Sequence, residues 1–336
     1  MRLGLVSIAP PFRCVIVTVK HSGLRLSVAL LLSIGLPCAQ AATSGLAALV
    51  EKHGLWVGSS SYTPPVYEIT ADTRTCRVDV GNAFQPLAAR WKSVPLPCDF
   101  QPADGTDSEA IVLDHVNDMT YEFWAMARDE RGRWRAEWGG ADRNSSFVQT
   151  PYGRQWRKDG GSNYGTQASG LSFIPGMVLE RELRAGKIPH AVQISVPFSC
   201  AEWKWPATRT DGNAARNDPS QCVPLGQVWK LPPGTDLSAL TPFARMVARA
   251  AIEHGLVATD QTFNVVGIRV ENWRRKWPSW STGEEPVDPY ASPGGHFGCD
   301  GRYNGRQVAP HDEFDCYPDH KHLFANFPWD KLVPIN

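Results

Sequence analysis

The sequence predicts a mainly β fold, an antiparallel β-sandwich of the jelly-roll or concanavalin-like type with one or two covering helices. Three observations lead to this prediction. Short apolar runs recur along the chain and are separated by turn-forming residues, as in strands joined by tight turns. Strand-like and helix-like segments do not alternate, which disfavours a parallel sheet built from βαβ units. The 27 prolines and 29 glycines are scattered and do not gather in one linker.

The individual strands are predicted from apolar runs bounded by turn signals. Residues 109–116 and 119–127 flank Asn117 and Asp118, which favour a turn, so these two runs indicate a β-hairpin. Further strand-like runs lie at 133–138, 190–198, 226–231, 255–260, 263–270 and near 331–335.

Two helices are predicted as covers of the sheet. The clearer one has Thr241 as a cap, Pro242 in its first turn and Gly255 as its end. Its apolar stripe consists of Phe243, Met246, Val247, Ala250 and Ala251. A shorter helix is predicted over residues 177–185, ending at Gly186.

The beginning of the chain predicts export. Lys20, His21 and Arg25 precede the apolar run LSVALLLSIGL, and AQA at 39–41 places small residues where a signal peptidase cleaves. We therefore expect residues 1–41 to be a cleaved signal peptide and the mature chain to be secreted or periplasmic. Residues 42–336 are expected to form a single β-sandwich domain, with 282–322 as a long disulfide-bridged loop before the last strand. The apolar run is too short to span a bilayer comfortably, so no stable membrane insertion is expected after cleavage.

Charge disfavours a nucleic-acid partner. Four of the 34 basic residues and none of the 34 acidic residues precede residue 42, which leaves the mature chain weakly acidic. A nucleic-acid-binding domain would normally carry a basic stripe. The sequence leaves the oligomeric state open.

Six cysteines remain after the predicted cleavage site, and they form three pairs of near neighbours. They are Cys76, Cys98, Cys200, Cys222, Cys299 and Cys316. An even number in an oxidising compartment predicts disulfides, and closing short loops costs the least entropy, so we expect pairing in sequential order. A zinc site is the alternative, but the chain has no close Cys-x-x-Cys pair.

The hairpin supplies the candidate catalytic pair. If Tyr121 and Phe123 face the core, Glu122 faces the other side, and a three-residue loop would place Asp114 directly opposite Glu122. Opposed Cβ atoms lie about 4.5 to 5.5 Å apart, close to the roughly 5 Å between the carboxyl groups of retaining glycosidases. A change of register by one residue would instead bring His115 toward Glu122. The structural alternative is that Asp114 caps the turn or forms a salt bridge and that Glu122 is solvated.

The segment after the predicted helix at 177–185 supplies further candidates. His190 begins a strand-like run, where it is either a buried histidine or the base of a cleft. All 13 tryptophans follow residue 42, and tryptophan rings stack on the CH faces of sugars. The candidate substrate-binding residues are His115, Trp124, Trp138, Trp203, Trp205, Arg209 and Asp211.

These residues predict an exported carbohydrate-active protein. The leading hypothesis is a polysaccharide-degrading glycosidase with Glu122 and Asp114 as its carboxylates and His190 assisting; a lyase would use His190 as the base and Arg209 to neutralise a uronate. The alternatives are a lectin-like module that binds glycan or cell-wall polymer without cleaving it, and a structural envelope protein. No cofactor and no metal are expected. The chain has no nucleotide, serine-hydrolase or zinc-peptidase motif, and the histidines and aspartates at 311–322 have no spacing that specifies a site.

The order of four motifs resembles a family of secreted bacterial proteins with a glucanase-like β-sandwich appearance and no established reaction. The motifs are DHV (114–116), YEFW (121–124), ASGLSFIPGMVLERELRAGKIPHAV (168–192) and WPATRTDG (205–212). The resemblance covers roughly residues 105–275 and the last strand. It implies the β-sandwich fold and a hairpin with an Asp-His step and a Tyr-Glu pair. The chain departs from the family pattern by its disulfides and by the insertion at 282–322.

Overall fold

The computed structural model describes residues 39–58, 62–81, 85–97, 100–143, 165–212, 222–262, 264–272, 302–303, 306–307 and 321–336. Within this part, the chain from Ala41 onward belongs to one compact unit. The predicted signal peptide lies almost entirely outside the described residues, and so does most of the predicted loop at 282–322. None of the described helices is both long and apolar enough to cross a membrane.

Strands dominate the described part of the chain, and the helices are few and short. The helices are α1 (Ala39–His53), α2 (Gln85–Arg90), α3 (Glu180–Ala185) and α4 (Pro242–Glu253), with 3-10 turns at Lys321–Phe324 and Trp329–Lys331. The largest sheet has six strands in the order β1 (Leu55–Gly58), β16 (Val266–Arg269), β11 (Val192–Val196), β15 (Leu256–Gln261), β14 (Val228–Lys230) and β19 (Val333–Pro334).

The remaining strands form one sheet of four strands and several smaller ones. The four-stranded sheet has the order β10 (Trp138–Arg143), β7 (Met119–Trp124), β6 (Ala110–Asp114) and β2 (Val66–Glu68). The three-stranded sheet contains β4 (Val78–Val80), β9 (Trp134–Ala136) and β8 (Ala127–Arg128). The two-stranded pairs are β3 (Thr75–Cys76) with β5 (Val94–Pro95), β12 (Ser199–Trp203) with β13 (Val223–Leu225), and β17 (Arg302–Tyr303) with β18 (Arg306–Gln307).

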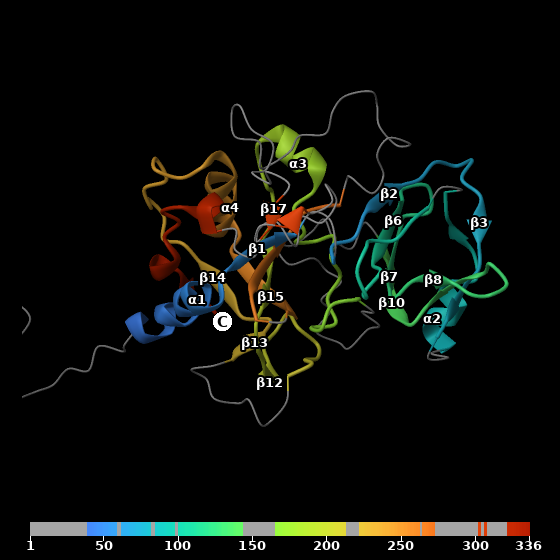
Figure 1. Cartoon of the computed structure of the whole chain (residues 1–336), viewed down its shortest axis with the longest axis horizontal. Helices are drawn as coiled ribbons and strands as arrows, with labels where there is room; N and C mark the ends of the chain where they lie inside the picture. Colours follow the sequence, from blue (N-terminus) through green and yellow to red (C-terminus); the bar gives the residue numbers. More distant parts are fainter. Residues whose placement is uncertain are drawn as a thin grey trace, which may run out of the picture. The chain divides into compact units, whose positions relative to one another are not determined.

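The prediction of a mainly β fold is confirmed, and the predicted runs from residue 109 onward contain strands. The sheets are mixed, however, and not purely antiparallel: β11 pairs with β15, and β1 with β16, in parallel. The connection from β11 to β15 contains α4 and is long enough for a crossover, which parallel neighbours require. The jelly-roll topology is not confirmed. In Figure 1, β2, β6, β7 and β10 have the blue and green colours of the first half of the chain, whereas β14 and β15 have the yellow and orange of the second half.

Both predicted helices are present. Thr241 caps α4, because its hydroxyl accepts a hydrogen bond from the Ala244 amide at 3.2 Å and donates one to the Leu323 carbonyl. The shorter helix, α3, begins three residues later than predicted and ends at Gly186, which has the left-handed conformation (φ 66°) that glycine favours.

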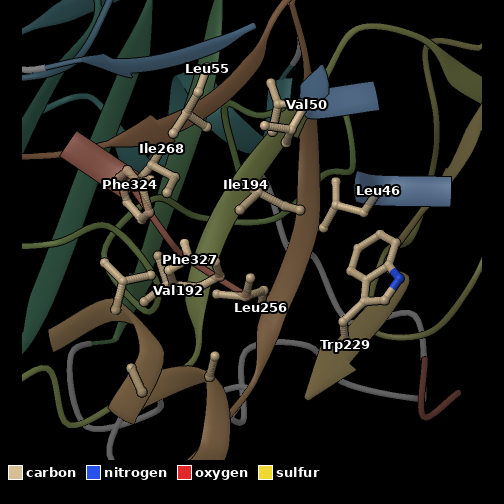
Figure 2. Close-up of a cluster of buried hydrophobic side chains, with 14 of the residues drawn as sticks. Leu46, Val50, Leu55, Val192, Ile194, Trp229, Leu256, Ile268, Phe324 and Phe327 are labelled. Carbon is tan, nitrogen blue, oxygen red and sulfur yellow. The ribbon is translucent and has the colours of Figure 1, made fainter. Parts of the chain in front are cut away.

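The six-stranded sheet is part of the largest apolar cluster. Figure 2 shows Leu46 and Val50 of α1 beside Ile194 of β11, with Leu256 of β15 in the same cluster. Phe243 of α4 also belongs to this cluster. The apolar faces of α1 and α4 are therefore covered by the sheet, as the periodicity of α4 predicts.

The four-stranded sheet is buried on both faces. Tyr121 and Phe123 of β7 belong to a cluster on one side, and Ile111 of β6 belongs to a cluster with Phe173 and Met177 on the other. A sheet covered on both faces has no open side. This feature decides where Glu122 lies.

The predicted disulfide between Cys200 and Cys222 is present. Cys200 on β12 is bonded to Cys222, beside β13. Cys76 is a free, half-buried thiol, so the predicted Cys76–Cys98 bond is not formed; on β3, Cys76 lies opposite Val94 of β5 and not opposite a cysteine. The predicted partners Cys98, Cys299 and Cys316 lie outside the described residues.

We expect Thr241→Ala to lower the free energy of unfolding by about 1 kcal/mol, because it leaves the Ala244 amide of α4 without its cap. Thr241→Ser is the matched control and should retain most of the stability, since it keeps the hydroxyl. Urea unfolding of the two variants measures the difference. Equal losses in both would show that the hydroxyl does not stabilise the helix.

Candidate functional site

The best candidate site is a polar pocket of about 560 Å³ between residues of the four-stranded and six-stranded sheets and the loops beside them. Its ionisable lining consists of Asp107, Glu109, Glu137, Asp211, Asp260, Arg209 and Arg269. Trp124 and Trp138 add two large aromatic surfaces. Carboxyl groups, guanidinium groups and indole rings thus converge in one cavity.

A buried arginine joins the two sheets at this pocket. The Nη1 atom of Arg269, on β16, lies 3.0 Å from Oε2 of Glu109. Its Nη2 atom lies 2.6 Å from Oδ2 of Asp260, on β15. Its side chain is only 6% exposed, and the ring of Phe173 lies 5.0 Å away. The Nη1 atom also donates to the carbonyl of Tyr62. The two carboxyl groups are therefore held in place by one guanidinium.

The loop at 165–172 forms the part of the pocket near the six-stranded sheet. Gly170 has a φ of 76°, and a Cβ atom at this position would lie 2.4 Å from Thr208 Oγ1, so only glycine fits without strain. The carbonyl of Ser169 accepts hydrogen bonds from the amides of Thr208 and Arg209. The loop is attached to β15 because the Ala168 amide donates to Asp260 Oδ1 at 3.0 Å.

The segment at 208–212 brings Arg209 and Asp211 to the pocket. Arg209 donates to the Gln167 carbonyl at 3.0 Å, lies 3.7 Å from Asp211 and approaches the ring of Trp138 at 5.8 Å. Trp138 itself donates to the Gly165 carbonyl at 3.2 Å. The Nε atom of Arg209 is buried without a hydrogen-bond partner among the described residues.

Burial changes the acidity of three carboxyl groups in the pocket. It raises the pKa of Glu109 to about 8, against the attraction of Arg269. It also raises the pKa of Asp107, which a hydrogen bond from the Trp124 side chain lowers, and the pKa of Asp211, which Arg209 lowers. The single positive charge of Arg269 can balance the negative charge of only one of its two carboxyl neighbours, Glu109 and Asp260. Asp260 also accepts amide hydrogen bonds from Ala168 and Gln261. With its pKa at about 8, Glu109 takes up a proton near neutral pH.

The predicted carboxylate pair is not formed. In the hairpin, Asp114 lies opposite Met119 and Glu122 lies opposite Ile111, so the loop has four residues and the predicted register is wrong. Asp114 and Glu122 consequently point to opposite faces of the sheet. Asp114 is buried and accepts hydrogen bonds from the Asn117 amide at 2.9 Å and its side-chain amide at 2.7 Å. Its role is to hold the turn.

Glu122 is buried behind the pocket. Its Oε1 atom accepts hydrogen bonds from the Phe173 amide (2.7 Å) and the Ser172 hydroxyl, and its Oε2 atom accepts from the Thr166 hydroxyl (3.1 Å). Burial raises the pKa of Glu122 to about 7, and the hydrogen bonds from Ser172, Phe173 and Thr166 limit the rise. Thr166 lines the pocket and Glu122 does not, so Glu122 positions the loop from outside the pocket lining.

His190 does not join this group. Its Nε2 atom lies 3.0 Å from Glu182 of α3, and its Nδ1 atom lies 3.0 Å from the Ala191 carbonyl. Burial lowers the pKa of His190, but the Glu182 carboxylate outweighs burial, so the pKa lies above its ordinary value. The histidine links α3 to the start of β11.

The seven predicted substrate-binding residues divide into two groups. Four of them line the pocket, namely Trp124, Trp138, Arg209 and Asp211. The other three lie elsewhere: His115 is exposed in the hairpin turn, 3.5 Å from Glu68, and Trp203 and Trp205 are each 51% exposed outside the pocket lining. Sequence reasoning thus found part of the pocket lining, whereas the predicted catalytic residues Asp114, Glu122 and His190 do not belong to it.

Sequence reasoning missed Asp107, Glu109, Glu137, Asp260 and Arg269. A signal for two of them was present, because Arg269 and Asp260 interrupt or end apolar strand-like runs. A charged residue in a buried strand needs an ionic partner. Within the described part of the chain, no group of three or more histidine, cysteine or acidic side chains has the arrangement of a metal site. The acidic and histidine residues at 311–320 lie outside that part.

The pH dependence of stability tests the environment of Glu122. Its pKa rises from 4.5 in water to about 7, so the folded chain binds this proton more tightly than the unfolded chain, and stability falls as the pH rises between these values. Glu122→Gln is neutral at every pH and can keep hydrogen bonds to Ser172 and Thr166. We expect the variant to gain stability relative to the wild type between about pH 5 and about pH 8, measured by urea unfolding. A stability difference that does not change with pH would contradict a raised pKa of the buried Glu122 carboxyl group.

Comparison of the chain with protein-family models, with curated proteins and with solved structures found no match. The resemblance to a secreted bacterial family therefore stays a prediction, and the functional conclusion depends on the geometry of the pocket.

Proposed function

We propose that this chain is an exported carbohydrate-active protein whose polar pocket binds a glycan. The observation that carries the proposal is the convergence of Trp124, Trp138 and five carboxyl groups in one cavity of about 560 Å³. An indole face covers the CH surface of a sugar, while carboxyl and guanidinium groups bond its hydroxyls. The cavity has the volume of a typical small-ligand site.

The proposed activity is hydrolysis of a glycosidic bond, with Asp107 as the proton donor. Glycosidases need one carboxyl group that keeps its proton and a second one that acts as nucleophile or base. Asp107 is half-buried, its pKa is raised by burial, and it remains at the pocket surface, whereas Glu109 is tied to Arg269. Asp211, the more exposed carboxyl beside Arg209, is the proposed second group.

The charge of the pocket favours a neutral or cationic sugar. With Glu109 and the proposed acid Asp107 both protonated, three carboxylates in the lining still face the two guanidinium groups of Arg209 and Arg269. The carboxylate of a uronate would be repelled by this excess of negative charge. The lyase hypothesis, in which Arg209 neutralises a uronate and His190 removes a proton, also loses its base, because His190 is paired with Glu182.

A lectin-like module is the second candidate, and one observation favours it. Trp203 and Trp205 are half exposed. The backbone carbonyl of Trp205 accepts a hydrogen bond from the Asn336 side chain at 2.7 Å. Such exposed indoles can bind a polymer surface without catalysis. The two functions differ in whether the bound glycan is cleaved.

Activity and binding should separate in the variants of the pocket. We expect Asp107→Asn to reduce the release of reducing ends from neutral polysaccharides by about 10²- to 10⁴-fold, because it removes the general acid, while glycan binding changes little. Trp138→Ala should weaken binding about tenfold, and Trp138→Phe should recover part of it by keeping an aromatic face. Reducing-end assays and calorimetry measure the two quantities.

Trp203→Ala is the matched control, since it removes an indole outside the pocket. Unchanged activity in this variant supports the pocket as the site. If the folded wild-type chain releases no product but binds glycan, and Trp203→Ala removes the binding, the lectin-like function replaces the enzymatic one.

A further inference from the structure

A second cavity, of about 440 Å³, lies beside the three-stranded sheet and is lined by four arginines. Arg74 and Arg77 flank β3, Arg128 ends β8, and Arg133 precedes β9. Among the described residues that line this cavity, Asp79 of β4 is the one with a carboxyl group. It shares no lining residue with the glycan pocket, so an inference from it does not depend on the function proposed above.

The arginines outnumber their carboxylate partners. Asp79 bonds Arg77 (Nε to Oδ1, 2.6 Å) and lies 3.7 Å from Arg133. Asp129, outside the lining, pairs with Arg133 at 2.7 Å. Four guanidinium groups thus face two carboxylates, which leaves a local excess of positive charge.

Two of the four arginines have no carboxylate partner among the described residues. Arg128 donates to the Gly132 carbonyl at 2.8 Å and lies over the ring of Trp134, 4.3 Å from its centroid. This stacking holds the guanidinium in place without neutralising it. The backbone carbonyl of Arg74 accepts a hydrogen bond from the Leu96 amide at 2.9 Å, which fixes this residue at the rim of the cavity beside β5.

We propose that this cavity is a binding site for a phosphate monoester of about the size of a sugar phosphate. Guanidinium groups donate paired hydrogen bonds to the oxygens of phosphates, and a phosphate monoester carries up to two negative charges at neutral pH. Its charge therefore balances the local excess, which a neutral sugar would leave uncompensated. The volume of about 440 Å³ also exceeds what one inorganic phosphate ion fills, and leaves room for the organic part of the ligand.

Glucose 6-phosphate is the probe for this site, and calorimetry measures its binding to the full chain. We expect Arg74→Gln and Arg128→Gln each to weaken binding about tenfold or more, because each removes a charge-assisted contact. Arg181→Gln is the matched control: Arg181 is an exposed arginine of α3, paired with Glu68 outside the cavity, and its loss should leave binding unchanged. Added salt should weaken binding to the wild type.

Three comparisons identify the ligand class. Glucose should not bind, glucose 6-sulfate should bind more weakly than the phosphate because it carries one charge less, and vesicles of phosphatidylglycerol should not compete. The proposal would be overturned if glucose 6-phosphate did not bind or if Arg181→Gln weakened its binding as much as the cavity variants do. It would also be overturned by equal affinity for the sulfate ester, or by binding to the vesicles alone. If Arg128→Gln fails to fold, Arg74→Gln still decides, since only the backbone of Arg74 has structural hydrogen bonds among the described contacts.

The half-buried thiol of Cys76 reports where the probe binds. Cys76 lines the cavity and is free, so bound glucose 6-phosphate should slow its modification by iodoacetamide, measured by peptide mass mapping. An unchanged rate at saturating glucose 6-phosphate would show that the probe binds elsewhere and would overturn the assignment.

Discussion

The buried guanidinium of Arg269 is the interaction on which the arrangement of the two main sheets depends. It belongs to the six-stranded sheet, and it bonds Glu109, directly before β6 of the four-stranded sheet, as well as Asp260 on β15 of its own sheet. Removing such an arginine would leave buried carboxyl groups without a counter-charge, which costs several kcal/mol in proteins. Arg269, Glu109 and Asp260 all line the polar pocket, so the guanidinium that joins the sheets also holds two of the pocket's five carboxyl groups in place.

Glu122 makes a second connection, from the four-stranded sheet to the loop at 165–173. Hydrogen bonds from Thr166, Ser172 and Phe173 end on this one carboxyl group, which is 1% exposed. The sheet is covered on both faces, so a polar residue on β7 must find its partners inside the protein. The residue that the sequence marks as catalytic is thus a positioning residue in the structure, and its neighbour Thr166 is the one that reaches the pocket.

Two cavities in the described part of the chain have opposite charge and lie on different elements. The pocket near Arg269 has an excess of carboxyl groups, and the cavity beside the three-stranded sheet has an excess of guanidinium groups. The whole chain has a formal net charge of zero, so composition conceals this separation. Charges of one sign that face a common hollow raise the local concentration of the opposite sign, and the ligands proposed for the two cavities differ in charge accordingly.

By itself the sequence determined the local features: the strand runs from residue 109 onward, the cap at Thr241, the end of α3 at Gly186 and the Cys200–Cys222 pair. Each depends on neighbours in the chain, on periodicity or on a short loop. The tertiary structure alone decided the hairpin register, the parallel pairs and the site. Glu109 and Arg269 lie 160 positions apart and meet only when both sheets are packed. Register depends on which faces are covered, and a pattern that is apolar on both faces of a strand does not specify it.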